Sequence, residues 1–315
     1  MKPNQKVKDK SIAVLIVTYN GMKWLAKCLE SCMDYPIIIV DNGSTDGTIE
    51  YIEKNFPQNT LLKQNKNLGF GQANNLGIKL ALEQNVEYVF LLNQDAYLHS
   101  NTIEVLIAAQ RRNPTYGILS PIHLNGKGNR LDRNFSNYVS YGSNPDFYSD
   151  FILKKPLQEI YEVPFVNAAG WLLSKKILEI VGGFDPIFFH YGEDDNYCQR
   201  VRYHGFKIGI VPKAFLNHDR EGRSNVGVHH LDSFLKLERK LKSRYGNINT
   251  DEFKDIDKHL RKKKKELIKL FLKLKFSKLA IVRREIYIAE KVFGEVSASR
   301  EKNILKGKHY LEEEE

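Results

Sequence analysis

Apolar and polar positions alternate along residues 11–120 in blocks that predict strands and helices in turn. Short runs that are apolar on both faces, such as 37–40 and 89–92, are typical of central strands in a parallel sheet covered by helices. Longer stretches between them, such as 21–33 and 71–84, carry apolar residues at helical spacing. The repeated strand–helix units predict an α/β fold whose mostly parallel sheet is flanked by helices.

The pattern changes twice further along the chain. Residues 121–160 are rich in Asn, Ser, Tyr and Gly and show weak periodicity, so we expect an irregular insertion there. Strand and helix patterns then return, and one predicted helix opens at Glu193. From about residue 231 the pattern becomes long, helical and basic, which predicts a basic helical C-terminal extension.

Composition fits a soluble globular protein, since 42% of the 315 residues are hydrophobic and 27% are charged. Three cysteines are too few for a disulfide framework, and Cys28 and Cys32 have helical spacing without a nearby histidine, which disfavours zinc and favours a reduced, cytoplasmic protein. The N-terminal residues lack the apolar core of a signal peptide, and no run of eighteen apolar residues predicts a membrane span.

The net charge of +10 is unevenly placed. Residues 231–315 hold about 23 Lys or Arg and 15 Asp or Glu, a net of roughly +8 (23 − 15). Lysines alternate with apolar residues over 267–282, which suits either a helical appendage with its lysines in water or contact with an anionic membrane surface, where each basic residue contributes about 1 kcal/mol. The two interpretations are compatible.

Four predicted strands end in polar clusters. The residues at these ends are Thr18, Tyr19 and Asn20 for the first strand, Asp41 for the second, Asn67 and Gly69 for the third, and Asn93, Gln94 and Asp95 for the fourth. One such end would indicate only a turn, because Asn and Asp are good turn residues. Four in succession predict a binding crevice, because ligands bind beyond the carboxyl ends of parallel strands.

The chemistry of these ends suits a nucleotide. Asp41 can accept a hydrogen bond from a base imide, and Tyr19 offers a face for stacking. Gly69 and Gly71 let backbone approach a ligand closely. Asp95 can hold a hard divalent cation that neutralises a diphosphate. The glycines form neither a Walker A loop nor the full dinucleotide fingerprint, which disfavours nicotinamide cofactors.

With these motifs in order, the chain resembles family-2 glycosyltransferases, which have the GT-A fold. The resemblance covers residues 11–220 and rests on IVTYNG, IIIVDNGSTDGT, NKNLGFGQANNLGI, VFLLNQDA, AAGWLLSKKILEIVGGFDPIFFHYGEDDNYCQRVRYHG and the later His218. Rhamnosyltransferase-like enzymes of bacterial cell-surface polysaccharide synthesis are the most similar subgroup.

The resemblance implies a role for each matching position. The donor site would comprise Thr18, Tyr19, Asn20 and Asp41 at the base and ribose, Asn67, Gly69 and Asn74 along the nucleotide, and Asn93, Gln94 and Asp95 in the acidic metal motif. Asp95 and His218 would bind Mg²⁺ or Mn²⁺. Asn93 departs from the family pattern, which has aspartate there, so Asp95 gains no second charge from it.

The acidic pair that opens the predicted helix would supply the catalytic base, with Asp194 favoured and Glu193 as the alternative. Acidic residues at a helix N-terminus also simply favour the helix dipole. Trp171, His190 and Tyr191 would line the acceptor site, although Trp171 suits a core position equally well.

The implied function is inverting transfer of a sugar from a nucleoside-diphosphate sugar, with dTDP-rhamnose favoured, to a hydroxyl of a bacterial cell-surface glycan or lipid-linked acceptor. Such transfers pass through an oxocarbenium-like state. A sugar nucleotidyltransferase could share the sheet but would not explain Glu193 and Asp194. A non-enzymatic module that binds anionic surfaces would explain only the charge, and nucleic acid is not expected because the basic excess lies outside the motifs.

These inferences divide the chain into a disordered tail (1–10), a catalytic domain (11–228) and a basic helical C-terminal region (229–315). Within the catalytic domain, residues 11–120 would bind the nucleotide sugar and residues 121–228 the acceptor. We expect a cytoplasmic protein, with a peripheral position on the inner face of the membrane compatible with its charge.

Overall fold

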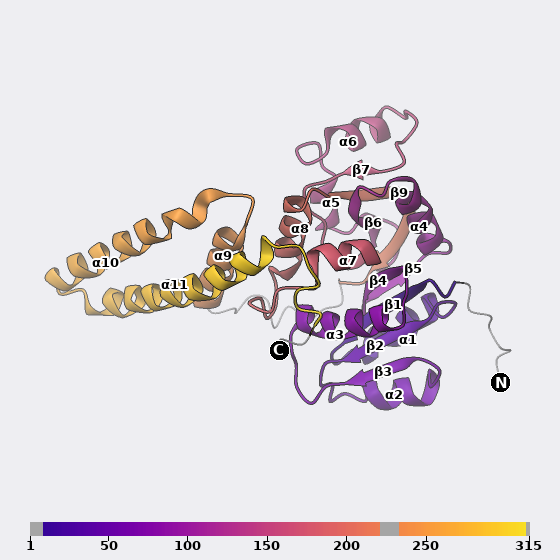
Figure 1. The fold of residues 1–315 in the computed structure, drawn as a ribbon, viewed down its shortest axis with the longest axis horizontal. Coiled ribbons are helices and arrows are strands. Elements are labelled where there is room, and N and C mark those ends of the chain that lie inside the picture. The colour runs from indigo at the N-terminus through magenta and orange to yellow at the C-terminus, as the bar shows by residue number, and fades with distance from the viewer. Residues whose placement is uncertain (1–8, 221–232, 313–315) are drawn as a thin grey trace.

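The computed structural model describes residues 9–220 and 233–312, and its main body is one mixed sheet with helices on both faces (Figure 1). The predicted tail, apart from residues 9 and 10, and the predicted boundary at 228/229 lie outside the described residues. A pair of long helices projects from this body on one side (Figure 1).

The sheet has nine strands in the order β3-β2-β1-β4-β8-β6-β9-β5, and β7 also pairs with β9. The strands are β1 (Ile12–Thr18), β2 (Ile37–Asp41), β3 (Thr60–Lys63), β4 (Tyr88–Asn93), β5 (Ala96–Leu98), β6 (Tyr116–Asn125), β7 (Tyr161–Glu162), β8 (Gly170–Ser174) and β9 (Lys207–His218). The first four run parallel, whereas β8 lies antiparallel between β4 and β6. The prediction of a mostly parallel sheet flanked by helices, with a basic helical C-terminal extension, is confirmed.

Helices follow most strands. They are α1 (Met22–Ser31), α2 (Thr48–Asn55), α3 (Phe70–Glu83), α4 (Thr102–Arg112), α5 (Phe135–Tyr138), α6 (Pro145–Ile152), α7 (Lys175–Val181) and α8 (Glu193–Tyr203), then α9 (Ser233–Gly246), a 3₁₀ helix (Asp251–Asp255), α10 (Ile256–Leu272) and α11 (Phe276–Asn303).

The region 121–160 is more regular than its composition predicts. Strand β6 continues through it to Asn125, and two short helices follow. Asn144 caps α6, because its side chain accepts from the amide of Phe147, and the side chain of Asp132 accepts from the amide of Phe135 at the start of α5. The predicted division at residue 120 falls inside β6.

The sheet is buried on both faces, which explains the continuous apolar runs in the sequence. In β1, Ala13 and Leu15 belong to one core cluster, whereas Ile12, Val14 and Ile16 belong to the cluster on the opposite face. A parallel sheet covered by helices requires this pattern. The sheet is therefore a rigid platform whose strand ends can carry a site.

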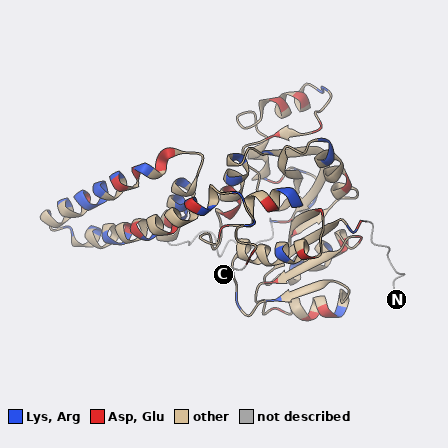
Figure 2. Cartoon of the chain, in the orientation of Figure 1, with Lys and Arg blue, Asp and Glu red and all other residues tan. Residues whose placement is uncertain are grey.

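The C-terminal helices form a separate small core and dock on the catalytic domain through a buried polar contact. Leu241, Ile288 and Val292 belong to this third core cluster. The carboxylate of Asp185 accepts hydrogen bonds from Ser299 (2.5 Å) and from Asn303 (2.8 Å) on α11. Lys and Arg residues are frequent along α10 (Figure 2). Within the described ranges, no helix combines the length and the apolar character needed to cross a bilayer.

Candidate active site

A cleft of about 640 Å³ lies at the carboxyl ends of the central strands. Its walls come from the ends of β1 and β4, the turn that opens α3, the insertion after β6, the residues before β8 and the segment that leads into α8. They are Val17, Tyr19, Trp24, Asn42, Asn67, Gly69, Phe70, Asn93, Gln94, Asp95, Asn134, Tyr138, Asn167, Ala168, Phe189, His190, Tyr191, Glu193, Asp194 and Arg220. Most of the predicted site residues are therefore brought together.

Thr18 and Asp41 lie side by side because β1 and β2 pair in parallel at these positions. Both side chains are buried, and Thr18 donates a hydrogen bond of 2.9 Å to the Asp41 carboxylate. Asp41 also accepts from the amides of Gly43 and Ser44 and from the Ser44 hydroxyl, which fills its four acceptor positions. Neither residue lines the cleft. In this arrangement they shape the loop after β2, and direct contact with a base would require one of these bonds to be exchanged.

Tyr19 and Gln94 form a two-point bridge between the ends of β1 and β4. The Gln94 amide accepts from the backbone amide of Tyr19 (2.9 Å) and donates to its carbonyl (3.1 Å). The Tyr19 side chain is 45% exposed and lines the cleft, so its face can stack on a planar ligand. Asn20 points elsewhere, because its side chain accepts from the amide of Thr45 and so supports the loop after β2.

Asn67 and Gly69 form a turn that faces the acidic end of the cleft. The side-chain oxygen of Asn67 accepts from the Gly69 amide (2.8 Å) and from the Asn42 side chain (2.9 Å). Gly69 has φ +84° and ψ 168°, a conformation that is open essentially to glycine alone. A Cβ atom there would collide with the carbonyl oxygen of Phe189, so this glycine allows the turn to pack against the segment before α8.

Asp95 and His218 form a buried pair at the floor of the cleft. The Asp95 carboxylate lies 3.4 Å from His218 Nε2, because β5 and β9 pair at Ala96 and His218. Burial lowers the pKa of His218 although Asp95 opposes this shift, so the ring is neutral near pH 7. Asp95 reaches the cleft, whereas His218 lies behind it. Arg220 donates to the His218 ring (3.0 Å) and lines the cleft.

A carboxylate and a neutral imidazole together are suitable ligands for Mn²⁺. Mg²⁺ prefers oxygen ligands, so it would use the carboxylate more than the imidazole. Across residues 9–220 and 233–312, no group of three or more His, Cys, Asp or Glu side chains is arranged to hold a metal ion. A cation at Asp95 would therefore need ligands from a bound substrate, as Mg²⁺ usually does when phosphate is present.

The helix α8 carries its first two carboxyl groups into the cleft. Tyr191 (φ +66°) and Gly192 (φ +99°) turn the chain sharply, so that Glu193 and Asp194 open the helix and line the cleft. Burial, reinforced by the charge of Asp194, raises the pKa of Glu193 to about 8. Burial also raises the pKa of Asp194 to about 6, although the amide of Asp195 donates to its carboxylate and opposes the shift. Near neutral pH the two groups therefore differ in protonation.

Two predicted site residues belong to the core instead of the cleft. Trp171 lies on β8, is fully buried and stacks on Phe184 with ring centroids 6.0 Å apart, so the prediction that it lines the acceptor site is wrong. Asn74 is also buried, and its side chain donates to the carbonyl of Phe70 within α3. Trp171 is buried by Phe184 and Tyr197, and Asn74 by its place on the inward face of α3, and motif position reveals neither contact.

The segment before α8 presents the other predicted acceptor residues at the cleft. His190 and Tyr191 are exposed and line it, and the guanidinium of Arg239 on α9 lies 4.7 Å from the Tyr191 ring. Phe189, Tyr138, Asn134 and Asn167 also line the cleft, but none of them is among the residues predicted from the sequence. Asn167 could have been found from its place directly before the matching segment AAGW, whereas nothing in the irregular stretch marks Asn134 or Tyr138.

We predict that Gly69→Ala destabilises the protein more than Gly47→Ala. Both glycines have positive φ, and such backbone costs an alanine roughly 1–3 kcal/mol, but a Cβ on Gly47 meets nothing within 4 Å whereas one on Gly69 meets the Phe189 backbone. Denaturant unfolding of the two variants measures the difference. Equal losses would show that the contact between the turn and the segment before α8 adds nothing.

Comparison with curated proteins finds two rhamnosyltransferases among the relatives. The N-acetylglucosaminyl-diphospho-decaprenol L-rhamnosyltransferase of Mycobacterium tuberculosis is 27% identical over 257 residues, which cover 72% of this chain and 83% of the relative. The dTDP-rhamnosyl transferase RfbF of Shigella flexneri is 26% identical over 223 residues, which cover 67% of this chain and 69% of the relative.

Two solved structures with bound nucleotide or nucleotide sugar share the fold. GalNAc-T7 with UDP, GalNAc and Mn²⁺ matches with a TM-score of 0.58 and 19% identity over 83% of this chain, which spans about half (51%) of that one. The S. aureus TarS 1-349 in complex with UDP-GlcNAc matches with a TM-score of 0.54 and 18% identity over 77% of this chain and 68% of that one. These likenesses show the GT-A fold.

The model of one protein family fits the segment that builds most of this cleft. The family is glycosyl transferase family 2, and the matched residues are 13–182, more than half of the chain. The match includes the polar ends of the first four strands and the turn at Gly69. The chain therefore belongs to glycosyltransferase family 2 and is of the rhamnosyltransferase-like type.

Proposed function

We propose that this glycosyltransferase moves a sugar, with rhamnose from dTDP-rhamnose favoured, to a hydroxyl of a lipid-linked or cell-surface glycan acceptor, with inversion at the anomeric carbon. One observation supports this most directly. The Asp194 carboxylate, whose pKa is raised to about 6, lines the same cleft as the polar ends of β1 and β4. The choice of donor and acceptor rests on the names of the two bacterial rhamnosyltransferases.

The donor would occupy the part of the cleft at the ends of β1 and β4. Tyr19 would stack on the base, and the Asn67–Gly69 turn would lie against the ribose and diphosphate, where glycine lets backbone approach closely. Thr18 and Asp41 would act through the loop that they hold. Arg220, a charged side chain on the cleft wall, would contact the departing diphosphate.

A divalent cation, Mn²⁺ or Mg²⁺, would be held by Asp95 together with the diphosphate, and when bound it would stabilise the leaving group. In this geometry His218 would orient Asp95 rather than bind the metal directly, since His218 does not line the cleft. Asn93 lines the cleft beside Asp95 but contributes no charge. The single carboxylate would give a weaker cation site than a pair would.

Asp194 would be the catalytic base and Glu193 would not. A base must be ionised at the working pH, and a pKa of about 6 leaves Asp194 mostly ionised near pH 7, whereas a pKa of about 8 leaves Glu193 mostly protonated. Asp194 would take the proton from the acceptor hydroxyl as the oxygen attacks. Glu193, still carrying its proton, would avoid placing a second negative charge beside the base.

The acceptor would approach along the segment before α8. His190 and Tyr191 are exposed there, next to the Asp194 carboxylate in sequence and on the same cleft. A lipid-linked acceptor would place the reaction at a membrane surface, and we propose a peripheral position on its cytoplasmic face.

Incubation with a panel of nucleotide sugars should release nucleoside diphosphate fastest from dTDP-rhamnose in the presence of a lipid-diphosphate sugar acceptor. The reason is that the deoxyribonucleotide and sugar must both fit the cleft before transfer can proceed. Coupled detection of the diphosphate product measures the rate for each donor. Faster release of diphosphate from a uridine or guanosine nucleotide sugar would contradict dTDP-rhamnose as the favoured donor.

We expect Asp194→Asn to lower transfer by roughly 10²–10⁴-fold while donor affinity is unchanged, because the amide cannot accept the proton. Glu193→Gln should keep most activity, since an amide resembles the protonated carboxyl. In the wild type, the rate should fall as the pH drops below about 6, where Asp194 becomes protonated. If Glu193→Gln were inactive and Asp194→Asn active, the base would be Glu193.

Asp95→Asn should remove the Mn²⁺-dependent part of nucleoside-diphosphate binding, and Asn93→Asp should strengthen it by adding a second carboxylate to the motif. Calorimetry of nucleoside diphosphate with and without Mn²⁺ measures both effects without any turnover. Equal affinity with and without the cation in the wild type would contradict a metal role for Asp95.

A further inference from the structure

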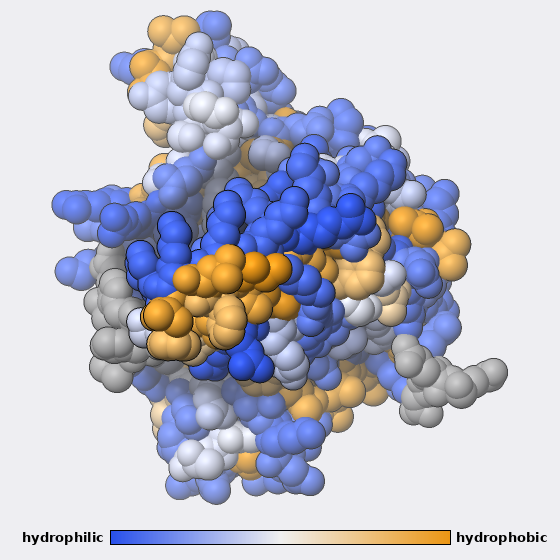
Figure 3. Space-filling view, turned by 90° about the vertical axis from the view of Figure 1, so that its left-hand side faces the viewer, coloured by the Kyte–Doolittle hydropathy of each residue, from blue (hydrophilic) through white to orange (hydrophobic). Residues whose placement is uncertain are grey.

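The connection between α10 and α11 exposes a cluster of apolar side chains that no part of the described fold covers. We call residues 268–281 the hairpin tip. Six large apolar side chains in it are 50–75% exposed: Ile268, Phe271, Leu272, Leu274, Phe276 and Ile281. They form a continuous hydrophobic patch surrounded by hydrophilic side chains (Figure 3). Clustered exposure of this kind marks an interaction site.

The turn itself adds to the exposed apolar surface. Leu274 has φ +54°, a left-handed conformation that helix ends usually assign to glycine or asparagine. Here the position holds a leucine that is 70% exposed. The left-handed backbone does not favour a leucine here. Leu274 also does not belong to the small core at the base of the hairpin, which includes Ile288 and Val292.

The charge around the tip is positive and largely uncompensated. Residues 256–284 carry 12 Lys or Arg and 2 Asp or Glu, a net charge of +10 (12 − 2), and no acidic residue lies between Glu266 and Glu285. Lys263 and Lys264 reach across to Glu285 (2.7 Å) and Glu290 (2.8 Å) on α11. Within the described part of the chain, the tip lysines form no ion pair: Lys269, Lys273, Lys275 and Lys278.

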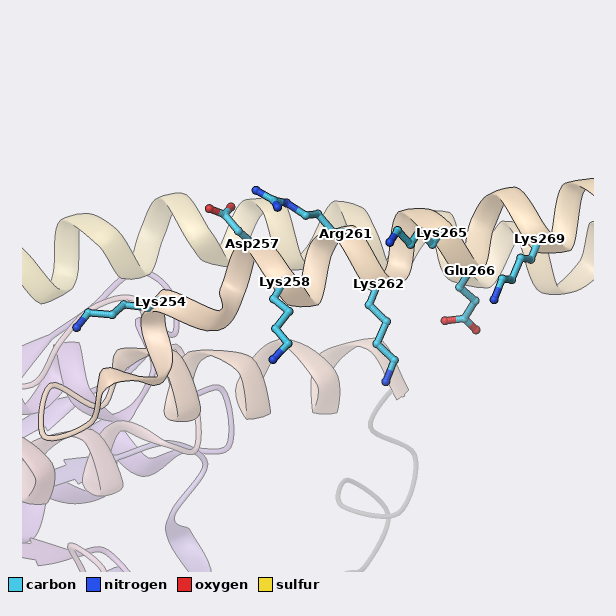
Figure 4. A pocket seen from close by; sticks show the side chains of 8 residues that line it. All are labelled: Lys254, Asp257, Lys258, Arg261, Lys262, Lys265, Glu266 and Lys269. Carbon is cyan, nitrogen blue, oxygen red and sulfur yellow. The ribbon is translucent and has the colours of Figure 1, made fainter.

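One face of α10 extends this charge along the helix. Lys258, Lys262, Lys265 and Lys269 recur at spacings of four, three and four residues, so they share a face, and Leu272 continues it one turn further. These lysines line a shallow hollow of about 780 Å³ together with Lys254, Asp257, Arg261 and Glu266. Lys258, Lys262 and Lys269 extend to the same side of the helix (Figure 4).

We propose that the hairpin tip anchors the protein on an anionic bilayer, with its apolar side chains in the headgroup and acyl-chain boundary and its lysines on lipid phosphates. An interfacial helix combines these two features, a basic polar face and an exposed apolar one. Neither α10 nor α11 can cross a bilayer, so the tip lies in one leaflet. A second copy of the chain is a poorer occupant, because two tips would bring like charges together.

This anchor deepens the proposed function, since an acceptor with a lipid anchor would lie in the same surface. It does not depend on the reaction, because membrane binding needs neither donor nor acceptor. Vesicle binding without sugar transfer would overturn only the proposed function, whereas transfer to a water-soluble acceptor without vesicle binding would overturn only the anchor.

Co-sedimentation of the full-length protein with vesicles tests the proposal. Binding is expected to phosphatidylcholine vesicles that contain phosphatidylglycerol, to weaken with salt, and to be much weaker with phosphatidylcholine alone. The triple variant Phe271→Ser/Leu272→Ser/Phe276→Ser should lose about tenfold or more in partitioning. The control Phe151→Ser/Leu153→Ser changes two side chains on and just after α6 with similar exposure (63% and 62%) and should bind as the wild type does.

A fluorescence measurement separates insertion from adhesion by charge alone. Phe271→Trp should show a blue-shifted emission with anionic vesicles, whereas Tyr287→Trp, exposed on α11 towards the base of the hairpin, should show none. Absence of a shift in Phe271→Trp, or wild-type vesicle binding by the triple variant, would overturn the proposal. Loss of self-association in that variant without any vesicle binding by the wild type would assign the tip to a second copy of the chain.

Discussion

Parallel pairing of β1 with both β2 and β4 is the constraint on which the rest of the site depends. It sets Thr18 beside Asp41 and Val17 beside Asn93, so that the polar residues after three strands meet at one edge of the sheet. Because the faces of these strands are filled by apolar residues, the strands cannot slip without exposing their cores. The geometry of this part of the cleft is therefore fixed by hydrophobic packing, and the polar residues need only occupy the strand ends.

The same constraint explains how much of this structure the sequence could predict. Strand ends are local features, so Tyr19, Gln94 and Asp95 were correctly expected at one crevice. The burial of Trp171 and Asn74 depends on which face of β8 and of α3 is turned towards the core, and motif position alone misplaced both. Periodicity predicted a helical C-terminal region, but the exposure of Phe271 and Leu272 at its far end depends on how two helices pair.

Burial and a neighbouring charge give the two carboxyl groups at the start of α8 different pKa values. Both groups are buried, and Glu193 also faces the charge of Asp194, so its proton is held more tightly. In the proposed mechanism, two adjacent carboxyl groups would thus provide one proton acceptor and one neutral neighbour. The sequence alone could name the pair but not rank its members, because rank depends on desolvation, which only the folded arrangement determines.

The packing of Gly69 against the carbonyl of Phe189 joins two halves of the cleft that would otherwise be separate walls. One half holds the turn at the start of α3, and the other carries His190, Tyr191 and the opening of α8. With no side chain between them, a displacement of either backbone is passed directly to the other. In the proposed function, occupation of the half at the α3 turn would therefore set the shape of the half that receives the second substrate, and the two substrates would bind in a fixed order.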